Sequence, residues 1–147
     1  MELLKRIEAD TKQAMKDKEP LKVSCLRLTS NALKLKSKDL MRPLTEEEEI
    51  HTLKSLAKQR RDACEIFLEA DRKDLADKEH AEFVIIETYL PVQLDEPGIN
   101  AILDQVFAEL NPSPKDTGKV MKEAMGRLAG RADGKLVNQL VRKRFEQ

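Results

Sequence analysis

Apolar residues recur every three or four positions along nearly the whole chain, and this spacing most constrains its fold. Over residues 2–17, for example, Leu3, Ile7 and Ala14 fall on one side of an expected helix. Such spacing places apolar side chains on one face of an α-helix. No stretch shows the period-two alternation that a half-buried strand requires. The sequence therefore predicts an all-α protein.

Prolines and capping signals divide this pattern into helices. Pro20 suits the first turn of a second helix, because its missing N–H would have no partner there. Thr45 followed by Glu48 is a capping box, which predicts the start of a third helix. A fourth helix is expected after Asp71. The second helix is expected to bury one stripe of residues: Leu21, Cys25, Leu28, Ala32 and Leu35.

A break follows in the segment Tyr89 to Leu94, where Pro91 biases the preceding residue away from helix. Three further helices are expected after it, the sixth stopped by Gly130. Their start signals are Asp95, then Ser113 with Pro114, then Asp133. The predicted organisation is an N-terminal four-helix bundle over residues 1–92 and a small C-terminal three-helix bundle over residues 93–147.

Composition and the first residues indicate whether the chain associates with a membrane and where it is located. The chain has 147 residues, of which 37% are charged and only 3% aromatic. No apolar stretch approaches the roughly 20 residues of a membrane span, so we expect no membrane association. The start, Met1 to Arg6, is amphipathic and contains an acidic residue, unlike a secretory signal or a transit peptide. We therefore expect a cytoplasmic location.

Sequence motifs for catalysis and metal binding are missing. The chain has no nucleotide-binding glycine loop, no nucleophile elbow and no zinc-protease helix motif. Cys25 and Cys64 lie far apart, so we expect buried or half-buried free thiols, with a disulfide or a metal site left open. A carboxylate cluster could include Asp62, Glu65, Glu69 and Asp74, but none of these residues stands three positions before a histidine, as a Glu-x-x-His motif of di-iron bundles requires. We expect no catalytic residue, no metal and no cofactor.

The last 35 residues are basic. Residues 113–147 contain nine Lys and Arg against four Asp and Glu, although the whole chain is neutral. Such asymmetry indicates a site for a polyanion at one end of the molecule. Glycines 118 and 134 permit close approach to the backbone, and helix starts offer free N–H groups to an anion. The candidate RNA-binding residues are Lys119, Lys122, Arg127, Arg131, Lys135, Arg142 and Lys143, with Gly118 and Gly134 for backbone approach.

A simpler interpretation of the same cations is a solvated helix face. Base stacking is not expected, because Phe145 is the one aromatic residue of this end and has core spacing. Any RNA recognition should then use the backbone and shape of a folded RNA. Outside this end, Arg60 and Arg61 could form a second anion site, but we expect them to pair with acids of their own helix. Tyr89 is expected to pack at the hinge, with a locally bonded hydroxyl.

Several segments, in this order and spacing, resemble the YqeY proteins and the tail of the B subunit of glutamine-dependent tRNA amidotransferases, the GatB/YqeY family. The segments are Lys58-Gln59-Arg60-Arg61-Asp62, Phe67 to Leu75, Tyr89-Leu90-Pro91-Val92-Gln93-Leu94, Gly118-Lys119-Val120-Met121, and Gly130 to Asn138. The resemblance covers essentially the whole chain. One departure is that Lys122 and Gly126 stand where a glycine and a proline are expected in typical YqeY chains. The resemblance therefore does not predict the backbone conformation within the sixth helix.

The resemblance implies a two-bundle helical fold and a link to tRNA, which the B-subunit tail contacts. The catalytic body of that subunit has no counterpart here. Family transfer would suggest carbon–nitrogen ligase activity with glutamine as amido donor, but we expect this chain alone to catalyse nothing. The partner implied is tRNA, with an amidotransferase or an aminoacyl-tRNA synthetase as a further partner. A helical protein-interaction module with an acidic partner is the alternative, and the oligomeric state is left open.

Overall fold

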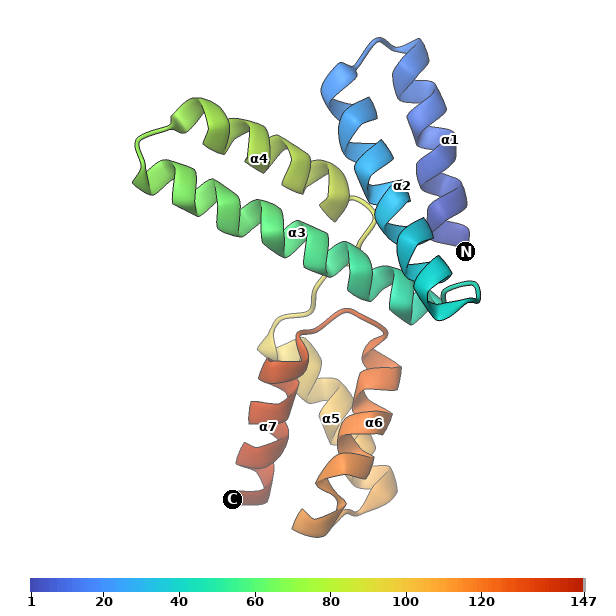
Figure 1. Cartoon of the computed structure of the whole chain (residues 1–147). Coiled ribbons are helices and arrows are strands. Elements are labelled where there is room, and N and C mark those ends of the chain that lie inside the picture. Colours follow the sequence, from blue (N-terminus) through green and yellow to red (C-terminus); the bar gives the residue numbers. More distant parts are fainter. Residues whose placement is uncertain (147) are drawn as a thin grey trace. The chain divides into compact units, whose positions relative to one another are not determined.

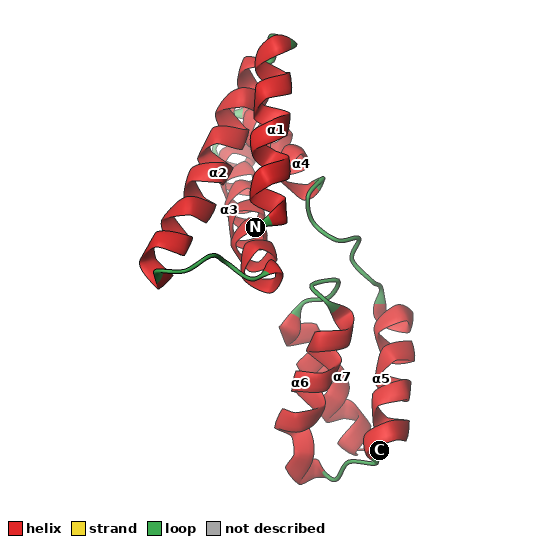
Figure 2. Cartoon of the chain, turned by 90° about the vertical axis from the view of Figure 1, so that its right-hand side faces the viewer, coloured by secondary structure: helices red, strands yellow, loops and turns green. Residues whose placement is uncertain are grey.

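The computed structural model describes residues 1–146, and all regular structure within them is helical (Figures 1 and 2). The helices are α1 (Glu2–Lys16), α2 (Pro20–Leu40), α3 (Glu46–Glu69), α4 (Lys73–Glu87), α5 (Glu96–Leu110), α6 (Thr117–Leu128) and α7 (Gly134–Glu146), with the short 3₁₀ helix η1 (Pro114–Asp116) before α6. The prediction of an all-α protein is confirmed.

The chain divides into two compact units, Met1–Leu90 and a second that begins at Pro91. Each unit has its own apolar core. Buried residues of the first include Leu26, Leu33, Leu53 and Ile86, and those of the second include Ile99, Leu103, Val106, Val120, Leu128 and Val137. The domains 1–92 and 93–147 stay a prediction. Gln147 lies outside the described residues.

In the N-terminal unit, α1 pairs with α2 and α3 pairs with α4 as two helical hairpins (Figure 1). Both hairpin turns use a residue with left-handed backbone conformation, Lys18 (φ 56°) and Asp71 (φ 59°). In the turn after α1, the Lys18 N–H donates to the Met15 carbonyl oxygen and the Glu19 N–H donates to the Ala14 carbonyl oxygen. Both acceptors lie in the last turn of α1. These bonds satisfy carbonyls that a helix end otherwise leaves unpaired.

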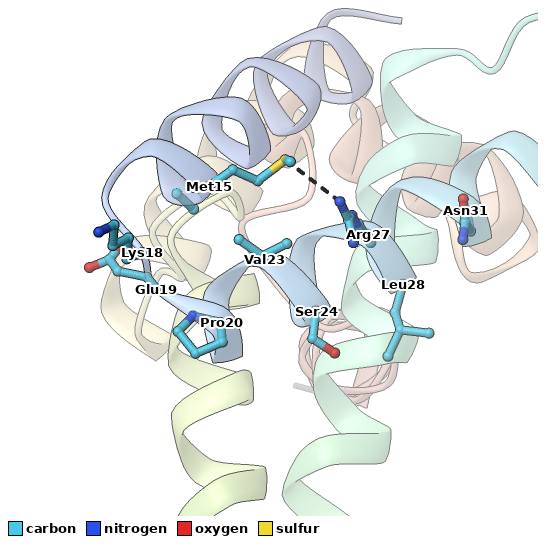
Figure 3. A pocket seen from close by; sticks show the side chains of 10 residues that line it. Met15, Lys18, Glu19, Pro20, Val23, Ser24, Arg27, Leu28 and Asn31 are labelled. Atoms are coloured by element: carbon cyan, nitrogen blue, oxygen red, sulfur yellow. Dashed lines mark hydrogen bonds between the residues drawn. The ribbon is translucent and has the colours of Figure 1, made fainter.

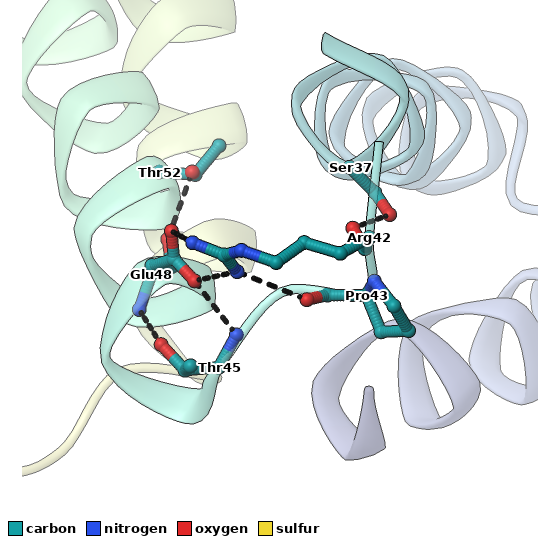
Figure 4. Close-up of polar contacts among 6 residues, drawn as sticks. All are labelled: Ser37, Arg42, Pro43, Thr45, Glu48 and Thr52. Atoms are coloured by element: carbon teal, nitrogen blue, oxygen red, sulfur yellow. Dashed lines mark hydrogen bonds and ion pairs between the residues drawn. The ribbon is translucent and has the colours of Figure 1, made fainter. Parts of the chain in front are cut away.

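The capping box predicted at the start of α3 is confirmed. The Glu48 N–H donates to the Thr45 hydroxyl oxygen over 3.2 Å, and the Thr45 N–H donates to the Glu48 carboxylate over 3.0 Å. The Arg42 guanidinium donates two hydrogen bonds to the same carboxylate, over 2.7 and 3.0 Å (Figure 4). The Arg42 bonds, followed by the Thr45 N–H, lower the pKa of Glu48 from 4.5 to about 2.

This lowered pKa predicts a specific acid sensitivity. Because the folded state holds Glu48 ionised, its contribution to stability is present above pH 4.5 and is lost as the pH falls toward about 2. Urea unfolding of Glu48→Gln should therefore show a weaker decline in the free energy of unfolding across this window than the wild type shows. Equal declines in both proteins would contradict the prediction. Glu47→Gln, in the same helical turn, serves as the control.

Two polar contacts attach α1 to distant parts of the N-terminal unit. Glu49 of α3 is 2% exposed and accepts the Leu4 N–H over 3.0 Å, so it caps the first turn of α1. The Tyr89 hydroxyl donates to the Asp10 carboxylate of α1, and the Arg6 guanidinium lies 4.8 Å from the centre of the Tyr89 ring. Burial, followed by the bond to Asp10, raises the pKa of Tyr89. The expectation of a locally bonded Tyr89 hydroxyl was wrong.

The buried stripe predicted for α2 was also partly wrong. Leu28 and Leu35 are 52% and 61% exposed, whereas Leu26 and Leu33 are fully buried beside Cys25. The second helix carries apolar residues on two faces, and the fold buries only one of them. Cys25 is a buried free thiol and Cys64 a half-buried one, as predicted. Burial, mainly, raises the pKa of Cys25 to about 11, which keeps it a thiol.

The C-terminal unit begins with α5, whose predicted cap is confirmed because the Gly98 N–H donates to the Asp95 carboxylate over 2.9 Å. The predicted start signal after residue 112 forms η1, which runs into α6. The helix α6 continues unbroken through Lys122 and Gly126, so the departure from the family pattern does not interrupt it. It ends at Leu128, before the left-handed residues Ala129 (φ 47°) and Gly130 (φ 81°).

Candidate functional site

Two of the predicted RNA-binding cations lie on the outer face of α6. Lys119 and Lys122 are exposed, and neither forms an ion pair with any residue in 1–146. The opposite face of this helix buries Val120 and Ala124 in the core of the unit. A side chain at Gly118 would meet nothing within 4 Å, so the backbone at the start of α6 is open to a ligand.

Three more predicted cations lie on α7. Lys135, Arg142 and Lys143 are exposed and without an ion pair to any other described residue. Lys135 and Arg142 are seven residues apart and therefore share one face of the helix. At the start of α7, the Lys135 N–H donates to the Asp133 carboxylate over 3.3 Å. A side chain at Gly134 would lie 3.9 Å from the Met125 methyl group, so the backbone there is partly covered.

The remaining two predicted residues have partners within the protein. The Arg127 guanidinium pairs with Glu109 of α5 and with Glu123 of its own helix, the latter over 3.0 Å. Its hydrogen bond lowers the pKa of Glu109. Arg131 is half-buried and donates to the carbonyl oxygens of Leu128 over 3.0 Å and Arg127 over 3.2 Å. Arg131 therefore caps the end of α6 and is not part of a solvated helix face.

Helix α5 supplies negative charge that the count over residues 113–147 did not include. Arg144 of α7 pairs with Asp104 over 2.7 Å, donates to the Asn100 carbonyl oxygen over 2.9 Å and lies 5.3 Å from the centre of the Phe107 ring. Together with the Arg127–Glu109 pair, this contact neutralises part of the basic end. The acids of α5 are visible in the sequence, but which cations they meet depends on how the three helices pack.

The prediction for Arg60 was wrong as well. Its guanidinium reaches from α3 to α4, where it lies 3.4 Å from the Glu79 carboxylate and 3.2 Å from that of Glu82. These are contacts between helices, not within one. Arg61 is exposed and has no ion pair to any residue in the described part of the chain. Arg60 is thus bound to structural carboxylates and is not available to an external anion.

The two hairpins of the N-terminal unit differ strongly in charge. Residues 1–42 contain eleven Lys and Arg against six Asp and Glu, whereas residues 43–90 contain seven against thirteen. The charge asymmetry within this unit is therefore larger than the excess of positive charge at the C-terminal end. The signal could have been found by counting charges for each expected pair of helices.

Comparison with known proteins decides the family. Residues 4–145 match the family described as Yqey-like protein, which is nearly the whole chain. The chain belongs to the YqeY family. The resemblance inferred from the sequence segments is thereby confirmed, and the YqeY domain is related to the C-terminal tail of the amidotransferase B subunit.

Three curated relatives of this YqeY-family chain are named Altered inheritance of mitochondria protein 41, mitochondrial. That of Lachancea thermotolerans is 34% identical over 73% of this chain and 59% of the relative. That of Pyrenophora tritici-repentis is 26% identical over 95% of this chain and 78% of the relative. That of Vanderwaltozyma polyspora is 35% identical over 57% of this chain and 46% of the relative. The aligned part of this chain thus spans about three fifths of the first relative's length.

These names correct the expected location. The prediction of a cytoplasmic protein rested on the amphipathic, acid-containing start of the chain, but all three relatives carry the word mitochondrial in their names. The composition of residues 1–6 was therefore a poor guide to location. In residues 1–146, the helices are too short or too polar to cross a membrane, and no group of acidic, His and Cys side chains there is arranged to hold a metal ion.

Proposed function

We propose that this YqeY-family protein is a tRNA-binding accessory protein that uses the exposed cations of its C-terminal unit. The observation that carries the proposal is that five predicted cations, on two adjacent helices, are exposed and unpaired within residues 1–146. They are Lys119, Lys122, Lys135, Arg142 and Lys143. The kinship to the amidotransferase B-subunit tail supports tRNA as the polyanion.

Binding of this kind neutralises backbone phosphates and reads the shape of the RNA. Lysine ammonium groups act as flexible point charges, so they fit phosphates whose spacing varies along a folded RNA. A side chain at Gly118 would meet nothing within 4 Å, so a phosphate can approach the backbone of α6 closely at this residue. Arg127 and Arg131 play a different part in this proposal. Arg127 joins α6 to α5 through Glu109, and Arg131 caps the end of α6.

The proposal gives the protein no catalytic step of its own. It presents or retains tRNA for an enzyme that modifies or charges it, an amidotransferase or an aminoacyl-tRNA synthetase. In the same proposal, α1–α4 form a four-helix bundle and α5–α7 a three-helix bundle. The separate cores of the two units support this arrangement. Because the aligned part of this chain covers 59% of the first relative's length, activities of those whole proteins are not transferred to it.

The salt dependence of tRNA binding tests the proposal. About four phosphate contacts predict that the logarithm of the association constant falls with that of salt concentration with a slope of roughly −3 to −4. A fourfold rise in salt should thus weaken binding on the order of 100-fold. The quadruple variant Lys119→Gln, Lys122→Gln, Arg142→Gln and Lys143→Gln retains Lys135 and should therefore bring the slope to about −1, measured by fluorescence anisotropy with labelled total tRNA.

A matched control removes charge from the other unit. Lys36 and Lys38 of α2 are exposed and unpaired among the described residues, so Lys36→Gln with Lys38→Gln should leave the slope nearly unchanged. No salt-dependent tRNA binding by the wild type at low ionic strength would end the RNA proposal. The protein would then be better described as a protein-interaction module. The exposed apolar residues of α2 favour that alternative.

A further inference from the structure

An open groove of about 760 Å³ lies where α1 ends and α2 begins (Figure 3). Met15, Val23 and Leu28 supply much of its apolar lining, and the turn at Lys18 to Pro20 closes one end. Met15 and Leu28 are each 52% exposed. Single exposed apolar residues are common on protein surfaces, but apolar residues gathered along one groove indicate a binding surface.

The groove exists because α2 is apolar on two sides. Its inner side packs Leu26 and Leu33 into the core of the unit, and Leu28 and Leu35 project from another side. Leu28 and Leu35 are seven residues apart, which places them on one line along the helix. This outer line has the spacing of a helix-packing surface, and both of its leucines are more than half exposed.

The groove is also positively charged. The Arg27 guanidinium points toward Met15 and donates to its sulfur over 3.6 Å, a weak acceptor (Figure 3). Arg27 has no carboxylate partner among residues 1–146, and Lys18 stands exposed at the turn. Glu19, the one acid of the lining, is paired with Lys22. A peptide segment with an apolar side chain between two carboxylates would match both the apolar lining of the groove and its positive charge.

The second half of α3 has this chemistry. Ile66 is 63% exposed, and Asp62 and Glu69 lie four residues before and three after it, on the same helix face. Neither acid forms an ion pair with another described residue. The opposite charge of residues 1–42 and 43–90 extends this complementarity to the two hairpins as wholes. A single chain therefore carries both the groove and a helix segment that is complementary to it.

We propose that the groove binds the α3 segment Asp62–Glu69 of a second copy of this chain. Ile66 enters beside Met15, Val23 and Leu28, and Asp62 and Glu69 face Arg27 and Lys18. In a two-fold dimer the contact occurs twice, because each copy offers one groove and one segment. The interface is small, so association is weak and depends on concentration and salt. It uses no residue of α6 or α7 and is independent of the tRNA proposal.

Sedimentation equilibrium of the full chain at several concentrations tests the proposal. The wild type should dimerise, and added salt should weaken the dimer. Leu28→Glu should weaken association by at least tenfold, and its fold should persist because Leu28 is half-exposed. Val92→Glu places the same charge at a residue 85% exposed outside this unit and should change association less than twofold. Circular dichroism confirms that each variant is folded.

Charge exchange between copies makes the test specific. Arg27→Glu alone should weaken the dimer, and so should Asp62→Lys combined with Glu69→Lys. A mixture of these two variants should associate again, since each groove then meets a segment of opposite charge. A wild type that stays monomeric, a failed rescue, or unchanged dimerisation of Leu28→Glu would overturn the proposal. Leu28-dependent binding of a monomeric chain to phosphatidylserine vesicles would overturn it too and assign the groove to lipid.

Discussion

Replacing Arg60 by methionine is expected to destabilise the N-terminal unit by about 2 to 4 kcal/mol. The guanidinium lies between Glu79 and Glu82 of α4, and the Glu82 side chain is only 6% exposed. Without Arg60, two carboxylates of one helix would face each other next to the buried thiol of Cys25, with little water to solvate them. Because Arg60 itself is 24% exposed, the cost lies below that of a fully buried pair. Urea unfolding followed by circular dichroism measures it.

The neighbouring residue provides a matched control. Arg61→Met removes the same charge from the same helix, but Arg61 is exposed and has no ion pair within residues 1–146, so its effect should stay within about 0.5 kcal/mol. Adding Glu79→Gln and Glu82→Gln to the Arg60→Met variant should recover more than half of the loss, because no unpaired carboxylate then remains. Equal effects of Arg60→Met and Arg61→Met would show that the contacts between the helices contribute nothing.

A second large effect is expected in the C-terminal unit. Leu103 of α5 is fully buried against α6 and α7, and Leu103→Ala should cost about 3 to 5 kcal/mol through lost burial and the remaining cavity. A unit of this size has a small core, and its total stability is of the same order. The variant should therefore unfold the second unit at a temperature at which the first stays folded. Hydrogen exchange followed by mass spectrometry of peptides from α5–α7 measures this.

The control for Leu103 is the same substitution at an exposed leucine. Leu35→Ala should change stability by less than about 0.5 kcal/mol, because the Leu35 side chain is 61% exposed. The two variants also test the proposed function. If tRNA binds the C-terminal unit, Leu103→Ala should lose tRNA binding when that unit melts, while Leu35→Ala keeps it. Retained binding by the melted variant would contradict a site on α6 and α7.

The positions of the helices could be predicted because their start signals are local. Thr45 with Glu48, and Asp95 with the Gly98 N–H, form caps between residues three apart, so their geometry is set once a helix begins. Pro20 and Pro91 act on their own backbone in the same way. These interactions need no tertiary contact, and the predictions that rested on them agree with the structure.

The polar contacts of the N-terminal unit could not be predicted for the opposite reason. Arg60 and Glu79 are 19 residues apart, and Asp10 and Tyr89 are 79 apart. Which pairs meet depends on how α1, α3 and α4 pack, and helical periodicity carries no information on that. The predicted stripe on α2 was partly wrong for a related reason. Periodicity shows that Leu28 is on an apolar face, but not that another apolar face of the same helix is the one the fold buries.

In the candidate site, too, some features could be predicted from the sequence and others depend on how the helices pack. That Lys119, Lys122 and Lys135 are exposed follows from their place on the polar side of an amphipathic helix. Arg127 and Arg131 have similar positions in the sequence pattern, yet one pairs with Glu109 of another helix and the other caps α6. Long arginine side chains can reach acceptors that a helical pattern does not reveal. The charge count of the C-terminal end therefore overstated the cations available to a phosphate.

The contacts that fix α1 also set an order of events during synthesis. The chain is made from its N-terminus, so the Leu4 N–H has no Glu49 until α3 begins, and Asp10 has no Tyr89 until α4 is complete. Until then, the apolar side of the α1–α2 hairpin that later packs on α3 and α4 is open to solvent and to other chains. Contacts of such large sequence separation form late in folding. Within the N-terminal unit, the first helix to be synthesised is thus the last to be fully held. We expect the nascent α1–α2 hairpin to be the part of this unit most in need of a chaperone.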